Sequence, residues 1–117
     1  MMFLLLACTT PTVDSKTGPT IWPSDDGAYT VEFTTDPDPL LSGPAHFDVS
    51  AEGATSLTFA ALMSAMGHGL SEDPVIGGAD GAFTVDCVFP MSGTWTLQFT
   101  LDGGAGADSA SGDVDVQ

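Results

Sequence analysis

The stretch Ala82–Leu101, AFTVDCVFPMSGTWTLQFTL, decides the fold, because it contains two runs in which apolar and polar residues alternate. The apolar positions are Phe83, Val85, Cys87 and Phe89 in the first run, and Trp95, Leu97, Phe99 and Leu101 in the second. A period of two is typical of a strand that buries one face. Pro90–Gly93, between the runs, has hairpin length and turn chemistry, so the sequence predicts a β-hairpin here.

Similar alternation occurs on both sides of this stretch. Its apolar positions are Tyr29, Val31 and Phe33, then Phe47 and Val49, then Leu57, Phe59, Ala61 and Met63, and finally Val114 and Val116. A short helix could also be drawn through Leu57–Met66, but the β-branched and aromatic content favours a strand. Turn residues such as Glu52-Gly53 separate the runs. The sequence therefore predicts an all-β protein, a single antiparallel immunoglobulin-like (Greek-key) β-sandwich of six to seven short strands.

Length and charge narrow the range of functions. The 117 residues fit one domain, and 16 acidic residues against the single cation Lys16 give a net charge of −15. Nucleic-acid binding requires many Lys and Arg side chains, so this composition excludes it, as it excludes docking on anionic lipids through a basic patch. A solvated acidic coat is the plainest interpretation of the charge.

The N-terminus has the features of an export signal. Residues 1–8 read MMFLLLAC, and Leu5, Leu6, Ala7 and Cys8 resemble a lipobox, in which the cysteine receives lipid and becomes the mature N-terminus. The apolar stretch is short, and no basic residues precede it, as expected of a truncated signal peptide. The alternative is an apolar N-terminus that is not cleaved. We expect lipid attachment at Cys8 and an extracytoplasmic location, periplasmic or cell-surface, anchored to a bacterial membrane.

The next segment differs in composition from the strands. Residues 9–27 are rich in Thr, Pro, Asp, Ser and Gly, which predicts a flexible polar tether before a folded domain at 28–117. Ile21 and Trp22 are the exceptions, and we expect them to add a short edge strand or to cover one end of the core.

Catalytic machinery is not recognisable in the sequence. The chain has two histidines, His46 and His68, and no Gly-x-Ser-x-Gly or phosphate-binding motif, so we expect a protein that is not an enzyme. Cys87 is in register with core positions, and His46 shares a strand face with Asp48 that we expect to meet solvent. Two acidic pairs lack the spacing of a calcium loop and are interpreted as turn residues: Asp36/Asp38 and Glu72/Asp73.

One loop carries candidate metal ligands. Met63, Met66 and His68 fall within six residues, and Met91 lies in the Pro90–Gly93 turn. Thioethers favour Cu(I) and imidazole binds either oxidation state of copper, so this set predicts a Cu(I) site. The alternative is structural, with the methionines filling the open end of the core and His68 bonding a turn.

The order of these motifs resembles the YtkA-like/FixH-like domain of bacterial extracytoplasmic proteins. The matching residues are Met66–Leu70, then Pro74, Gly81–Phe83 and Phe89–Trp95, and the resemblance spans about residues 28–101. It implies an immunoglobulin-like sandwich associated with copper trafficking and with assembly of copper-containing oxidases. It places Met66 and His68 nearest the metal, with Met91 opposite. This sequence departs from the family at two points: Ser64-Ala65 stand where many relatives have a Pro, and the loop has a single histidine. These departures leave fewer candidate metal ligands.

Two functions follow as expectations. In the first, a lipid-anchored domain binds or transfers copper in support of a copper-dependent respiratory complex, with a copper protein or oxidase as partner. In the second, the domain binds no metal and docks as an interaction or assembly module on a membrane partner.

Overall fold

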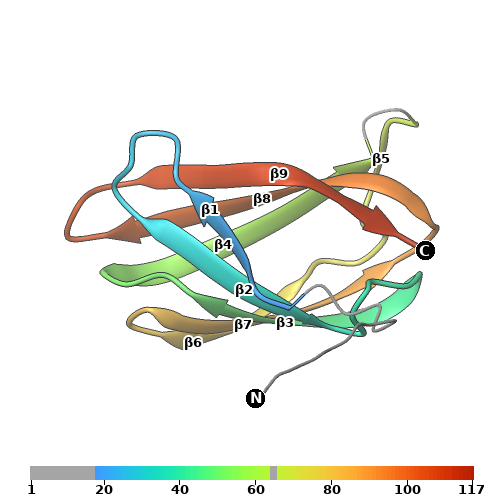
Figure 1. Ribbon diagram of the computed structural model, residues 1–117, viewed down its shortest axis with the longest axis horizontal. Helices are drawn as coiled ribbons and strands as arrows, with labels where there is room; N and C mark the ends of the chain where they lie inside the picture. Colours follow the sequence, from blue (N-terminus) through green and yellow to red (C-terminus); the bar gives the residue numbers. More distant parts are fainter. Residues whose placement is uncertain (1–17, 64–65) are drawn as a thin grey trace, which may run out of the picture.

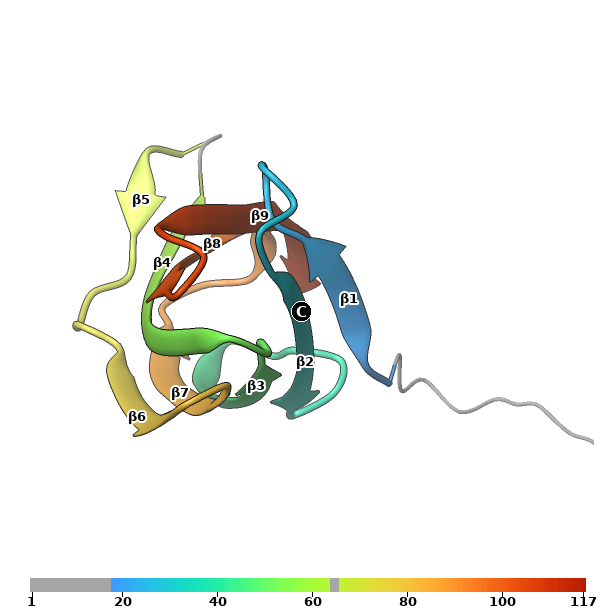
Figure 2. The ribbon, with the colours of Figure 1, turned by 90° about the vertical axis from the view of Figure 1, so that its left-hand side faces the viewer.

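The computed structural model describes residues 18–63 and 66–117, and these form two antiparallel sheets packed face to face (Figures 1 and 2). The predicted signal peptide, Cys8 and the first part of the predicted tether lie outside the described residues. The strands are β1 Thr20–Pro23, β2 Thr30–Asp36, β3 Gly43–Ser50, β4 Ala54–Met63, β5 His68–Gly69, β6 Val75–Ala79, β7 Ala82–Phe89, β8 Gly93–Gly103 and β9 Asp108–Val116. No helix in this part of the chain is long and apolar enough to cross a bilayer.

The strand order confirms the predicted Greek-key sandwich. One sheet, sheet A, has the order β1-β2-β3-β7-β6, and the other, sheet B, has the order β5-β4-β8-β9. In immunoglobulin constant-type domains the order is A-B-E-D against C-F-G. Strands β2-β3-β7-β6 and β4-β8-β9 reproduce that order, with β5 beside β4 and β1 added beside β2. The seven expected strands are present, including β1 at Ile21 and Trp22, and β5 and β6 are additional.

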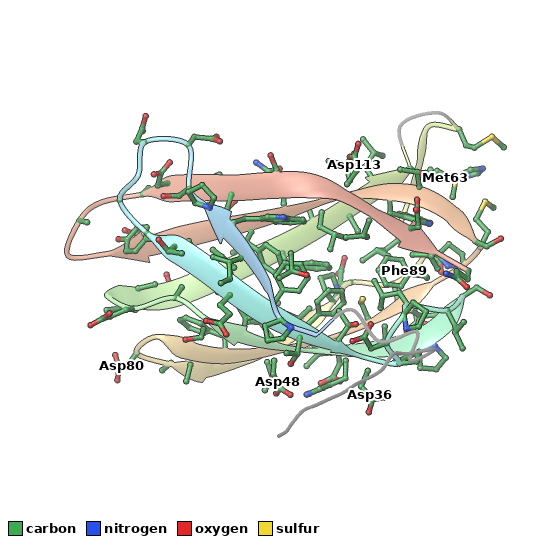
Figure 3. All side chains as sticks on the ribbon, viewed as in Figure 1. Asp36, Asp48, Met63, Asp80, Phe89 and Asp113 are labelled. Atoms are coloured by element: carbon green, nitrogen blue, oxygen red, sulfur yellow. The ribbon has the colours of Figure 1, made fainter. Side chains whose placement is uncertain are left out.

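The predicted hairpin at Pro90–Gly93 is wrong. Strand β7 belongs to sheet A and β8 to sheet B, so this connection crosses from one sheet to the other. The apolar faces of β7 and β8 therefore meet across the core instead of lying side by side. Figure 3 shows Phe89, at the end of β7, inside the sandwich. A short connection with turn chemistry is compatible with both arrangements, and only the long-range pairing distinguishes them.

The alternating apolar residues form the core, as the pattern predicts. The largest fully buried side chains are Trp95, Phe47, Phe89, Phe99, Leu97, Leu101, Val31 and Val85. The Phe47 ring lies 5.3 Å from that of Phe59 across the two sheets, and Phe89 meets Trp95 edge-on at 5.3 Å. Aromatic pairs in this geometry add to the free energy of burial. Residues Leu57–Met63 are in β4, so the helical alternative is excluded.

A buried carboxylate joins the β1–β2 turn to the start of β9. Asp108 Oδ2 accepts hydrogen bonds from the backbone N–H groups of Asp26, at 3.0 Å, and Ala28, at 3.3 Å. Its Oδ1 accepts one from the N–H of Ser109 at 2.9 Å. Hydrogen bonding by Ser24, together with these backbone donors, lowers the pKa of Asp108 below its usual value, although burial opposes the shift.

This arrangement makes stability depend on pH. The charged form of Asp108 is favoured in the folded state, so its contribution to stability is full above the ordinary Asp pKa, about 4, and is lost as pH falls through the lower folded pKa. We expect Asp108→Asn to lower the free energy of unfolding at pH 7 and to differ progressively less from wild type in acid. Urea unfolding between pH 7 and pH 2 tests this, with the exposed Asp102→Asn as control; a pH-independent difference would contradict it.

Candidate functional site

The β4–β5 hairpin and the β7–β8 connection lie at the same end of the sandwich (Figure 1, right). Strand β4 ends at Met63, whose register partner in β5 is His68. The N–H of Met66 donates to the carbonyl oxygen of Met63 at 3.1 Å. Gly67 has a φ of 68°, a left-handed conformation that glycine adopts without strain. The chain therefore reverses directly in front of His68.

Met63 joins this hairpin to the β7–β8 connection. A Cβ atom at Gly93 would lie 2.6 Å from the Met63 Cε atom and 3.6 Å from its Sδ atom, so the thioether packs on the Gly93 backbone. The Trp95 Nε1–H donates to the carbonyl oxygen of Met91 at 3.1 Å and holds that turn against the core. Figure 3 places Met63 and Phe89 at this end of the molecule. We call this region, which consists of Met63, Met66–His68 and Pro90–Gly93, the methionine end.

The four candidate ligands differ in exposure. Met63 is 4% exposed and continues the apolar face of β4. This position matches the structural alternative, in which a methionine fills the end of the core. Met66 is 61% exposed, and His68 is also exposed. Met91 is half-buried and packs against the core cluster. In the part of the chain that the structure describes, the His68 side chain makes no hydrogen bond or ion pair.

The other histidine has both ring nitrogens engaged. On the outer face of sheet A, His46 Nδ1 lies 2.7 Å from Asp86 Oδ1 and His46 Nε2 lies 3.2 Å from Asp48 Oδ1. Hydrogen bonds with Asp86 and then Asp48 raise the pKa of His46 above its usual value. The expected solvent-facing position is confirmed, but the sequence did not reveal Asp86, whose pairing with His46 comes from the β3–β7 register.

The remaining candidate metal ligands are Cys87 and the two acidic pairs. Cys87 is buried and, within the described ranges, free, and burial raises the pKa of its thiol to about 11. Burial therefore disfavours the thiolate that a metal would bind. Among the residues placed by the structure, no group of three or more His, Cys, Asp and Glu side chains could hold a metal ion, which includes Asp36/Asp38 and Glu72/Asp73. Thioethers are a separate class of ligand.

Comparison with protein-family models, with curated proteins and with solved structures finds no match to this chain. The resemblance to the YtkA-like/FixH-like domain therefore stays a prediction.

Proposed function

We propose that this domain binds Cu(I) transiently at the methionine end and supports a copper-dependent respiratory complex from a lipid-anchored, extracytoplasmic position. One observation carries the metal part of the proposal. The Met63–His68 pairing and the packing of Met63 on Gly93 bring the two methionine-bearing turns to one end of the sandwich. Soft ligands from separate segments must converge in this way to share one ion.

The chemistry of the donors fits a weak Cu(I) site. The exposed thioether of Met66 and the exposed imidazole of His68 are soft and borderline ligands, with the thioether of Met91 as the third. Met63 has a supporting role in this proposal, because its side chain is buried and packs on the Gly93 backbone. Exposed ligands suit an ion that is received and passed on. The anchor at Cys8 is a prediction from the lipobox-like residues, and an oxidase or copper-protein partner is a prediction from the family resemblance.

A metal-free docking function is the competing proposal, and one observation favours it. Leu62 is 47% exposed and Met66 is 61% exposed on the same hairpin, so apolar side chains face solvent at the methionine end. A membrane partner such as an oxidase subunit could cover them. Crosslinking from this hairpin in intact cells, with and without copper, separates the two functions. Capture that is independent of copper favours docking.

Competition titration tests the copper proposal. We expect His68→Ala to weaken Cu(I) binding by about tenfold or more, because one of three ligands is lost, when the full chain competes with a chromophoric Cu(I) chelator. Met66→Leu should have a similar effect, since leucine keeps the shape of the side chain without the sulfur.

The chain offers a matched control for each substitution. His46→Ala removes the other histidine, on the outer face of sheet A, and Met63→Leu removes a buried thioether while it retains an apolar side chain of similar size. Both should bind Cu(I) within a factor of about two of wild type. Equal affinities of wild type and His68→Ala would refute the copper proposal and leave the docking function.

A further inference from the structure

A second candidate site lies on the outer face of sheet A, where a cavity of about 330 Å³ opens to solvent. Four of its lining residues form one row across neighbouring strands, because Asp36 is the register partner of His46, His46 that of Asp86, and Asp86 that of Val75. Figure 3 shows Asp36, together with Asp48, on the side of this sheet that faces away from the core. The side chains of the row therefore face solvent, and we call this site the sheet A cavity.

Part of the wall of the sheet A cavity is apolar. Pro44 and Val88 are register partners in β3 and β7, and they lie on the same face as His46 and Asp86, because strand residues two apart share a face. Val75 also lines the cavity and is 66% exposed at the start of the edge strand β6. A ligand that covers these side chains would remove apolar area from water, which favours binding.

The rest of the lining carries negative charge. Asp36 and Asp86 belong to the outer-face row, and Glu72 and Asp73 come from the connection between β5 and β6. Asp86 Oδ1 lies 2.7 Å from His46 Nδ1, a bond that leaves its other oxygen to a ligand. Within the described residues, the carboxylates of Asp36, Glu72 and Asp73 make no hydrogen bond or ion pair. Four carboxylates against one imidazole keep the cavity negative even when His46 is protonated.

We propose that the sheet A cavity binds an arginine side chain of a partner protein, with its aliphatic stem against Val75 and Val88 and its guanidinium among the carboxylates. A guanidinium is more weakly hydrated than an ammonium ion and can bond two carboxylates at once, which suits a wall that is partly apolar and partly acidic. A chain with a net charge of −15 also attracts a cationic partner surface. The inference is independent of both functions proposed above, because the cavity shares no residue with the methionine end.

Nuclear magnetic resonance of the valine methyl groups in the full chain tests the proposal, with the capped peptide acetyl-Gly-Arg-Gly-amide as the probe at neutral pH and constant ionic strength. The methyl signals of Val75 and Val88 are expected to shift saturably, whereas those of Val31, which is fully buried in the core, are the internal reference. The same peptide with citrulline, which keeps the shape of arginine without its charge, should bind at least about fivefold more weakly. The lysine peptide should bind at least about twofold more weakly, because its ammonium ion is more strongly hydrated.

Charge-matched variants complete the test. Glu72→Gln/Asp73→Asn changes two exposed residues and should weaken binding of the arginine peptide by about threefold or more, through loss of nearby charge. Asp113→Asn/Asp115→Asn removes the same charge from the outer face of sheet B, where both carboxylates accept threonine hydroxyls, and should bind the peptide as wild type does. Unmoved Val75 and Val88 signals, equal binding of the citrulline or lysine peptide, or equal effects of the two double variants would each overturn the proposal.

Discussion

Replacement of Trp95 by alanine is expected to lower the free energy of unfolding by about 4 kcal/mol, the largest effect of any single truncation considered for this domain. The side chain is fully buried, so its truncation to alanine leaves a cavity in the core. The ring packs edge-on against Phe89 at 5.3 Å, across the junction between β7 and β8. A cavity of this size in a sandwich core relaxes only partly, and this adds to the lost transfer free energy.

The indole also makes a hydrogen bond that phenylalanine cannot make. The Trp95 Nε1–H donates to the carbonyl oxygen of Met91 and holds the connection between the sheets. Trp95→Phe keeps an aromatic ring beside Phe89 but leaves that carbonyl without its partner, so we expect a smaller cost of about 2 kcal/mol. Urea unfolding followed by far-ultraviolet circular dichroism measures both variants. A Trp95→Ala cost below about 1 kcal/mol would show that the ring is not a core element.

The parts of the fold that could be predicted are those that depend on local pattern. Strands β2, β3, β4, β7 and β8 each bury one face, and the period of two follows directly from that burial. Strand β6 was missed because its sequence, VIGGA, has two adjacent glycines and no buried residue, which gives no alternation. Strand β5 has two residues, too few for any pattern.

What could not be predicted depends on pairing between distant residues. Pro90–Gly93 has the length of a hairpin, but whether β7 and β8 pair or face each other depends on β3 and β4, which take the neighbouring positions in each sheet. Asp86, which bonds His46, is 40 residues away in sequence. Trp22 and Gly112, which are in contact, lie near opposite ends of the described sequence. Within the candidate copper site, the sequence indicated the soft ligands, whereas the enclosed position of Met63 and the exposed position of Met66 required the fold.

Gly103 is a position where this long-range arrangement permits no side chain. It ends β8 opposite Ala54, where the β4–β8 register shifts between Ala54 and Ser56. A Cβ atom at Gly103 would lie 2.3 Å from the Gly53 carbonyl oxygen and 3.0 Å from the Tyr29 hydroxyl. The first contact is with backbone, which cannot rotate away as a flexible side chain can. The shift in register therefore brings the Glu52-Gly53 turn directly against β8.

We expect Gly103→Ala to lower the free energy of unfolding by about 3 kcal/mol, because the β3–β4 turn or the end of β8 must move to admit the methyl group. The adjacent Gly104→Ala is the control, since a Cβ there meets nothing within 4 Å, and it should change stability by no more than about 0.5 kcal/mol. Tyr29→Phe removes the second of the two oxygens and its bond to the Gly106 carbonyl. If the hydroxyl contributes to the clash, Gly103→Ala should cost less in the Tyr29→Phe background than in wild type, a coupling that a double-mutant cycle measures. Equal costs for Gly103→Ala and Gly104→Ala would show that the turn does not press against β8.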